Sequence, residues 1–216
     1  FEDCVQSLAR ILYAAAKDFA FLADSSALNG FDRRDFLKVL HVKELPFHEQ
    51  KTVLAEGLKV LMQVLRSVYG KEVIVLVDEY DVPLNHARTA GYYNDLFPLL
   101  KEMLSAALKD NKNLFKGVVT GCLRIAKESV FTDLNNFGSH SVSDSDLAAA
   151  VGFTRDEADH ILSDFNLTPW SVPVRQHYDG YRFGNEEIYC PWDLLSFCRD
   201  FAKKRPIVFN NYWINT

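Results

Sequence analysis

The chain has 216 residues, enough for one domain with a sizeable core plus a small appendage, which is the arrangement we expect. Apolar residues make up 48% of the chain and charged residues 25%, values that exclude disorder, collagen and coiled coil. The formal net charge is −5 and the basic residues are scattered, so the chain carries no direct sign of nucleic-acid binding.

The first 70 residues are predicted to be helix and loop. Apolar residues recur at three- and four-residue steps over residues 1–22 and again over residues 49–69, which predicts two amphipathic helices. Between them, Asp32 is a plausible N-cap for a shorter helix through residue 40. Gly70 is expected to end the second long helix as its C′ residue.

Residues 71–84, KEVIVLVDEYDVPL, are the most informative stretch of the chain. The apolar run VIVLV predicts a strand buried on both faces of a parallel sheet, with Asp78 and Glu79 at its carboxyl end. Ligands of such sheets gather at that end of the strands. The pattern resembles a Walker B element, in which the first acid holds Mg²⁺ and the second orients the attacking water. The alternative is an ordinary strand followed by a solvated acidic turn.

A second strand is predicted after one further helix. Residues 82–92 are expected to form a loop, and residues 93–108 carry the apolar spacing of a helix. Residues 114–123, LFKGVVTGCL, then supply a second buried run with Thr120 near its carboxyl end and Cys122 inside it. Because one helix separates the two runs, we expect neighbouring parallel strands, both nearly inaccessible to solvent.

The last third of the chain is rich in aromatic residues. Thr154 or Asp156 is expected to open a helix, and residues 168–174, with two prolines, are expected to link two lobes. Turn signals in HYDGYRFGNEEIY, residues 177–189, predict short extended pieces, and residues 192–201 predict a helix.

These aromatic residues are interpreted as a small second core. In this interpretation Tyr181, Trp192 and Phe197 are largely buried. The alternative is that the rings stack on a nucleobase or on a partner peptide. Zinc binding by His177, Cys190 and Cys198 is a weaker hypothesis, because their spacing matches no common site.

Four blocks carry a family resemblance: VIVLVDEYDVPL, GVVTGCLRIAKESVFTDLNNF, HYDGYRFG, and YCPWDLLSF with the terminal NNYWINT. In this order they resemble the bacterial AAA-ATPase-like proteins that are often fused to a PD-(D/E)XK nuclease-like domain. The resemblance implies an α/β fold with the three-layer parallel sheet of a P-loop NTPase of AAA or STAND type. That core, incomplete or degenerate here, would occupy residues 1–140, and a small helical, aromatic-rich lid would occupy residues 141–216.

The resemblance also implies roles for individual residues. Glu79 would be the catalytic carboxylate that acts on the attacking water, Asp78 would hold the metal, and Thr120 would lie at the end of the sensor 1 strand. Apart from the resemblance, Arg124 and Lys127 follow the second predicted strand, where a cation could reach a γ-phosphate, and they fit an ordinary solvated pair at a helix start equally well.

One departure from the family pattern is important. No GxxxxGK[ST] motif occurs in the chain, so the usual cradle for the β- and γ-phosphates is absent from it. ATP and Mg²⁺ are therefore expected as cofactors only if a longer parent chain supplies that loop, and the isolated chain is expected to be inactive. Either the chain is a trimmed fragment or it belongs to a naturally degenerate relative.

The function favoured by these patterns is a regulatory nucleotide-binding module whose ATP state controls an attached effector. The expected partner is another protein or a fused effector domain, which by the family resemblance would be nuclease-like in fold. With no apolar run of roughly 18 residues and no paired cysteines, we expect a cytoplasmic protein without a membrane partner.

Two alternatives remain. The first is a degenerate pseudo-ATPase that serves as a protein-interaction scaffold. The second, less favoured, is a metal-dependent nuclease, because Asp81 completes three carboxylates in four positions, although no Lys follows Glu79 at the nuclease spacing. Asp81 is instead expected to be an N-cap or a loop-setting acid before Pro83.

Overall fold

The computed structural model describes residues 1–122, 137–141, 143–144, 146–203 and 206–212, and all statements below concern these residues. It divides the chain into two compact units, Phe1–Phe137 and Gly138–Thr216, each of which is described by itself. No helix in the described part of the chain is both long and apolar enough to cross a membrane.

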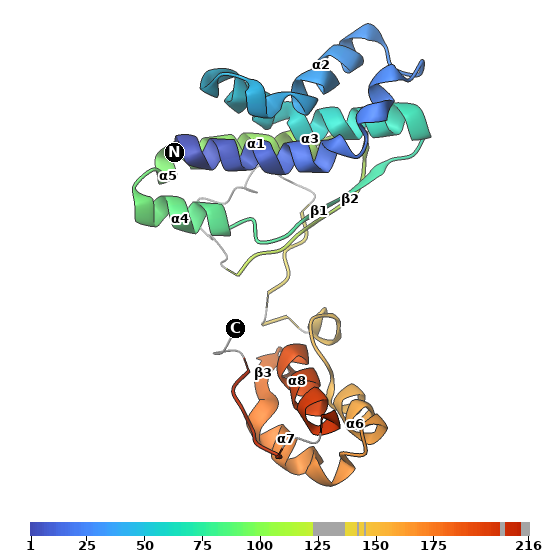
Figure 1. The fold of residues 1–216 in the computed structure, drawn as a ribbon, viewed down its shortest axis with the longest axis vertical. Helices are drawn as coiled ribbons and strands as arrows, with labels where there is room; N and C mark the ends of the chain where they lie inside the picture. Colours follow the sequence, from blue (N-terminus) through green and yellow to red (C-terminus); the bar gives the residue numbers. More distant parts are fainter. Residues whose placement is uncertain (123–136, 142, 145, 204–205, 213–216) are drawn as a thin grey trace. The chain divides into compact units, whose positions relative to one another are not determined.

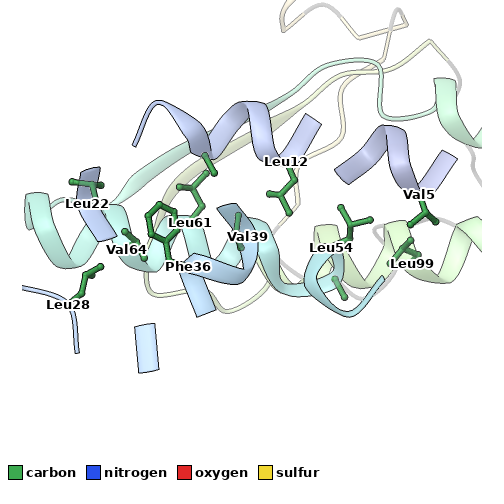
Figure 2. Close-up of a cluster of buried hydrophobic side chains, with 12 residues drawn as sticks. Val5, Leu12, Leu22, Leu28, Phe36, Val39, Leu54, Leu61, Val64 and Leu99 are labelled. Carbon is green, nitrogen blue, oxygen red and sulfur yellow. The ribbon is translucent and has the colours of Figure 1, made fainter. Parts of the chain in front are cut away.

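A group of helices forms one side of the first unit. Helix α1 (Glu2–Lys17) and helix α2 (Gly30–Leu40) both pack on the long helix α3 (Phe47–Tyr69), with the short 3₁₀ turns η1 (Ala20–Asp24) and η2 (Val42–Glu44) between them (Figure 1). Figure 2 shows the core that they share with helix α5, built from Val5, Leu12, Leu22, Leu28, Phe36, Val39, Leu54, Leu61, Val64 and Leu99.

The ends of these helices depend on local chemistry. Helix α3 ends at Gly70, which has φ of 67°, as the sequence predicted. Helix α2 begins after Asn29, whose side chain accepts hydrogen bonds from the N–H groups of Phe31 and Asp32. The prediction of Asp32 as the N-cap was wrong, because Asn29, three residues earlier, accepts hydrogen bonds from the free N–H groups of the first turn.

The two predicted strands form a parallel pair. Strand β1 (Val73–Val77) is followed by helix α4 (Val82–Ala90), helix α5 (Tyr93–Leu108) and strand β2 (Leu114–Val119), which pairs parallel with β1. The parallel pairing and the intervening helix α5 are therefore confirmed. The loop expected over residues 82–92 is wrong: Pro83 lies in the first turn of α4, where its missing N–H costs nothing, and Gly91 ends the helix with φ of 82°.

The sheet is covered by helices on one face only. Val75 and Val77 on β1 pack against the core built by α4 and α5, whereas Ile74 is 57% exposed and Leu76 74% exposed. On β2, Val118 is also 41% exposed. The expectation that both strands are nearly inaccessible is wrong, and so is the placement of Cys122 in a buried strand, because β2 ends at Val119 and Cys122 is exposed. Among the described residues the sheet has two strands and no second helical layer.

The second unit is a helical bundle around a short hairpin. It contains η3 (Ala148–Ala150), α6 (Arg155–Asp164), η4 (Thr168–Trp170), α7 (Ser171–Tyr178), β3 (Asp179–Phe183), β4 (Glu186–Tyr189) and α8 (Pro191–Ala202). Strands β3 and β4 pair antiparallel, which confirms the short extended pieces. Thr154 caps α6 through a capping box with Glu157. The linker predicted over residues 168–174 is wrong, since those residues belong to η4 and α7.

The aromatic core of this unit is only partly the predicted one. Phe197 is 2% exposed, as expected, and lies stacked on Phe209 with ring centroids 5.2 Å apart. Trp192 and Tyr181, however, are 44% and 43% exposed, so the prediction that they are buried was wrong. The hairpin has only two strands and Trp192 lies in the first turn of α8, so neither ring is enclosed on all sides. Tyr178 and Tyr189 are the buried tyrosines instead.

Candidate functional site

The backbone pairing of the parallel strands continues past their formal ends. The Thr120 N–H donates to the Val77 carbonyl oxygen at 2.9 Å, and the Tyr80 N–H donates to the Thr120 carbonyl oxygen at 3.1 Å. These two bonds hold Asp78 directly beside Thr120. The Thr120 hydroxyl donates a hydrogen bond to Asp78 Oδ1. Two of the predicted site residues, 42 positions apart in the chain, are therefore in contact.

Asp78 and Thr120 continue the uncovered face of the sheet. Leu76 pairs with Val118 in the register of β1 and β2, and side chains two positions further along each strand lie on the same face. Asp78 and Thr120 occupy those positions, and both are exposed. The outer face of the sheet is thus mostly apolar, with exposed Lys116 opposite Ile74, and it becomes polar at its carboxyl end.

Glu79 is held in an unusual backbone conformation. Its φ is 53°, in the left-handed region that residues other than Gly, Asn and Asp seldom adopt. Its carbonyl oxygen accepts a hydrogen bond from the Val82 N–H at 3.1 Å, which closes the turn into helix α4. The side chain is exposed beside Asp78. Strained conformations of this kind cluster at functional sites, so the geometry agrees with a role for this carboxylate.

Asp81 points into the protein and away from the two exposed acids. It is 1% exposed, and its Oδ1 accepts a hydrogen bond from the Cys122 N–H at 3.3 Å. Its Oδ2 accepts one from the Asn85 side chain at 3.4 Å. It occupies the N-cap position of α4, but its side chain makes no capping hydrogen bond to that helix. Its carboxylate instead fastens the segment after β2 to the segment after β1.

This arrangement bears on the metal-dependent nuclease hypothesis. Among the residues that the structure describes, no group of three or more His, Cys, Asp or Glu side chains is placed to hold a metal ion. The three carboxylates of DEYD diverge, because Asp81 is directed toward Cys122. The local geometry gives the nuclease alternative no support.

Gly121 fits where a larger residue would not. A Cβ atom there would lie 2.6 Å and 2.8 Å from ring atoms of Tyr80 and 2.7 Å from Asp81 Oδ1. Contacts below 3.0 Å force some atom to move, and the carboxylate is itself held by a hydrogen bond. Gly121 therefore lets the two strand ends approach closely.

Sequence reasoning predicted Asp81 as an N-cap or loop-setting acid, and Asp81 does occupy the N-cap position of α4, but its bond to the segment after β2 and the role of Gly121 were not predicted. The available signals were an acid three residues after Asp78 and a glycine directly after Thr120. The remaining predicted site residue, Arg124, lies outside the described residues.

Comparison with known proteins agrees with this local architecture. Residues 3–131 match the model of a family described as "Predicted AAA-ATPase". The chain belongs to the AAA-ATPase-like family. The matched region contains β1, α4, α5 and β2, and hence Asp78, Glu79 and Thr120.

One relative extends the comparison. The chain is 30% identical over 148 residues to an uncharacterized protein from the vnfD 5′ region of Azotobacter chroococcum mcd 1. The match covers 68% of this chain but 27% of that protein, so the chain spans about a quarter of the relative's length. No solved structure matches the chain at a significant level.

Proposed function

We propose that this chain supplies the Walker B half of an ATP and Mg²⁺ site in a nucleotide-dependent regulatory module. The observation that carries the proposal is the contact between Asp78 and Thr120 at the carboxyl ends of two adjacent parallel strands. In open parallel sheets this is the edge at which ligands bind. Membership of the AAA-ATPase-like family supports the same assignment.

The exposed groups suit Mg²⁺ rather than a metal held by the protein alone. Mg²⁺ prefers oxygen ligands, keeps several waters, and in nucleotide sites is held by one or two carboxylates together with the phosphates. Asp78 offers such a carboxylate, and the Thr120 hydroxyl fixes its orientation by binding Oδ1. Glu79, next along the chain, would position the attacking water.

The phosphates would need partners from elsewhere. The sequence contains no GxxxxGK[ST] loop, and the chain spans about a quarter of its relative. The proposal therefore places the phosphate loop in another part of a longer protein, where the nucleotide state would control an attached effector domain. The competing function is a pseudo-ATPase scaffold, in which the same strand ends contact a protein and no nucleotide.

Metal binding can be tested on this chain directly. Mn²⁺, a paramagnetic substitute for Mg²⁺, should broaden the amide NMR signals of residues 78–80 and 120, and Asp78→Asn should remove the effect. Asp110→Asn is the matched control, because Asp110 is an exposed acid before the opposite end of β2. Equal broadening in Asp78→Asn and the unaltered chain would contradict the assignment of Asp78.

Catalysis is tested separately. ATP turnover by the 216-residue chain should equal that of buffer, because it lacks the phosphate loop. In a longer protein that contains the loop, Glu79→Gln should abolish hydrolysis and leave ATP binding intact. Robust turnover by the isolated chain, or a Glu79→Gln variant with normal turnover, would overturn the proposed role of Glu79. Failure of the longer protein to bind ATP would favour the scaffold.

A further inference from the structure

The second unit contains a cavity that the family assignment does not explain. Its volume is about 480 Å³, and three segments line it: the junction of α7 and β3, the first turn of α8, and residues 209–211. The lining includes the rings of His177, Tyr178, Tyr181 and Phe209 and the carboxylate-bearing residue Asp193. The residues matched by the family model end before this unit begins.

The aromatic walls of the cavity are held in place by specific contacts. The His177 ring stacks on Phe209 with centroids 4.2 Å apart and planes 17° from parallel. His177 Nδ1 lies 2.8 Å from the Pro173 carbonyl oxygen and donates to it. The Tyr178 hydroxyl donates to the Asn210 carbonyl oxygen at 3.1 Å. These contacts fix the rings before any ligand arrives, which lowers the entropy lost on binding.

The Asp193 carboxylate has one oxygen that accepts no hydrogen bond from the described residues. Its Oδ1 is shielded from water and has no hydrogen-bond partner in the part of the chain that the structure describes. Buried polar atoms almost always have such a partner. The described lining residues include no Lys or Arg that could neutralise the carboxylate. Asp193 is itself part of the cavity lining, so a ligand that brings both a positive charge and N–H donors would pair with its carboxylate.

We propose that this cavity binds a guanidinium group. A guanidinium is planar and weakly hydrated, stacks on aromatic faces, and presents parallel N–H groups to a carboxylate. Arg199 lies over the Trp192 ring at 6.0 Å, so this unit already contains a guanidinium packed on an aromatic face. Residues 138–216 contain eleven acidic and seven basic side chains, and the resulting negative charge attracts a cation.

Nucleotides fit the cavity less well. A nucleobase would stack on the rings, but its phosphates would meet Asp193 and no Lys or Arg among the described lining residues. The guanidinium itself could belong to a free arginine-like metabolite or to an arginine side chain of a polypeptide. The proposal rests on the second unit alone and does not depend on the proposed ATPase role of Asp78.

The test is binding to the full chain, measured by calorimetry and by NMR shifts of His177 and Tyr181. The probes are N-acetylarginine methylamide, its neutral analogue N-acetylcitrulline methylamide, and a ten-residue peptide with one central arginine. Arginine should bind at least about tenfold more tightly than citrulline, because only arginine brings a charge to the carboxylate. If the peptide binds more tightly than N-acetylarginine methylamide, the guanidinium group is assigned to a polypeptide. If the two bind equally, it is assigned to a free metabolite.

Variants separate the cavity from general electrostatic attraction. Asp193→Asn keeps the shape of the side chain and should weaken arginine binding at least about tenfold. Asp164→Asn makes the same charge change at an exposed residue of α6 and should leave binding unchanged. Thermal melts of both variants establish that the unit remains folded. Equal arginine affinity in Asp193→Asn and Asp164→Asn would overturn the proposal, and so would equal binding of the arginine and citrulline probes.

Discussion

Replacing Gly121 by Ala tests the close approach of the two strand ends. The added Cβ would lie 2.6–2.8 Å from the Tyr80 ring and from Asp81 Oδ1, whose carboxylate is buried and hydrogen-bonded to the Cys122 N–H. Overpacking of this kind costs about 1–3 kcal/mol. For a chain of this size each kcal/mol lowers the melting temperature by about 2–4 °C. A cost of about 2 kcal/mol therefore predicts a decrease of about 4–8 °C.

Gly30→Ala is the matched control for this experiment. Gly30 is the first residue of α2, has no atom within 4 Å of an added Cβ, and does not have a positive φ. The same chemical change there should leave the melting temperature unchanged or raise it slightly. Calorimetry of both variants provides the comparison. If Gly121→Ala and Gly30→Ala have the same melting temperature, the inference that the close contacts at residue 121 require glycine is refuted.

A second measurement locates the clash. Tyr80→Ala removes the ring atoms nearest the new methyl group, so the double variant Gly121→Ala/Tyr80→Ala should lose less stability than the sum of its two single variants. Additive losses of stability would indicate that the methyl group clashes with the Asp81 carboxylate and not with the Tyr80 ring. NMR shifts of the Cys122 and Thr120 amides would report the displacement of the strand end.

Three further predictions concern other parts of the chain. Because Glu79 has φ of 53°, Glu79→Val should lower the free energy of unfolding by about 1–2 kcal/mol, whereas Glu79→Gly should leave it nearly unchanged. Urea unfolding measures both variants, and equal losses would contradict backbone strain at this residue. Phe197→Ala should lower the free energy of unfolding by about 3–5 kcal/mol and Trp192→Ala should lower it clearly less, because Phe197 is 2% and Trp192 44% exposed. Thermal melts that show the reverse order would contradict the core described above. Burial raises the pKa of the Cys198 thiol from 9.0 to about 11, which favours the protonated form in the folded state. The stabilisation that the buried thiol contributes is thus complete below pH 9 and is lost as the pH rises from 9 toward 11. Iodoacetamide should modify exposed Cys122 well before Cys198.

The elements that the sequence predicted correctly are those set by local patterns. The end of α3 at Gly70 follows from the left-handed conformation that glycine tolerates, and the start of α6 follows from the capping side chain of Thr154, one of the two candidates. The strand VIVLV and the helix after it follow from apolar spacing, and together they predicted the parallel pair. The contact of Asp78 with Thr120 then follows from the rule that parallel strands end at one edge.

The incorrect predictions depended on what lies opposite each residue. An uninterrupted apolar run is the same sequence whether helices cover one face of its strand or both, so the exposure of Leu76 was not predictable from it. Trp192 and Phe197 belong to one helix and are similarly apolar, but only Phe197 faces the other rings. The direction of Asp81 depends on Cys122, 41 residues away, which no local pattern reports.

The one-sided sheet also has a consequence for association between molecules. Among the described residues each strand of the β1 and β2 pair has one edge without a neighbour, and the outer face carries exposed Ile74, Leu76 and Val118 with a single charge at Lys116. A short, uncharged, β-branched segment with an open edge is a template for strand addition and aggregation. Charge on this face, introduced by Leu76→Lys, opposes such self-association without entering the core beneath β1. The strand that positions Asp78 is therefore also a segment at which another strand can add.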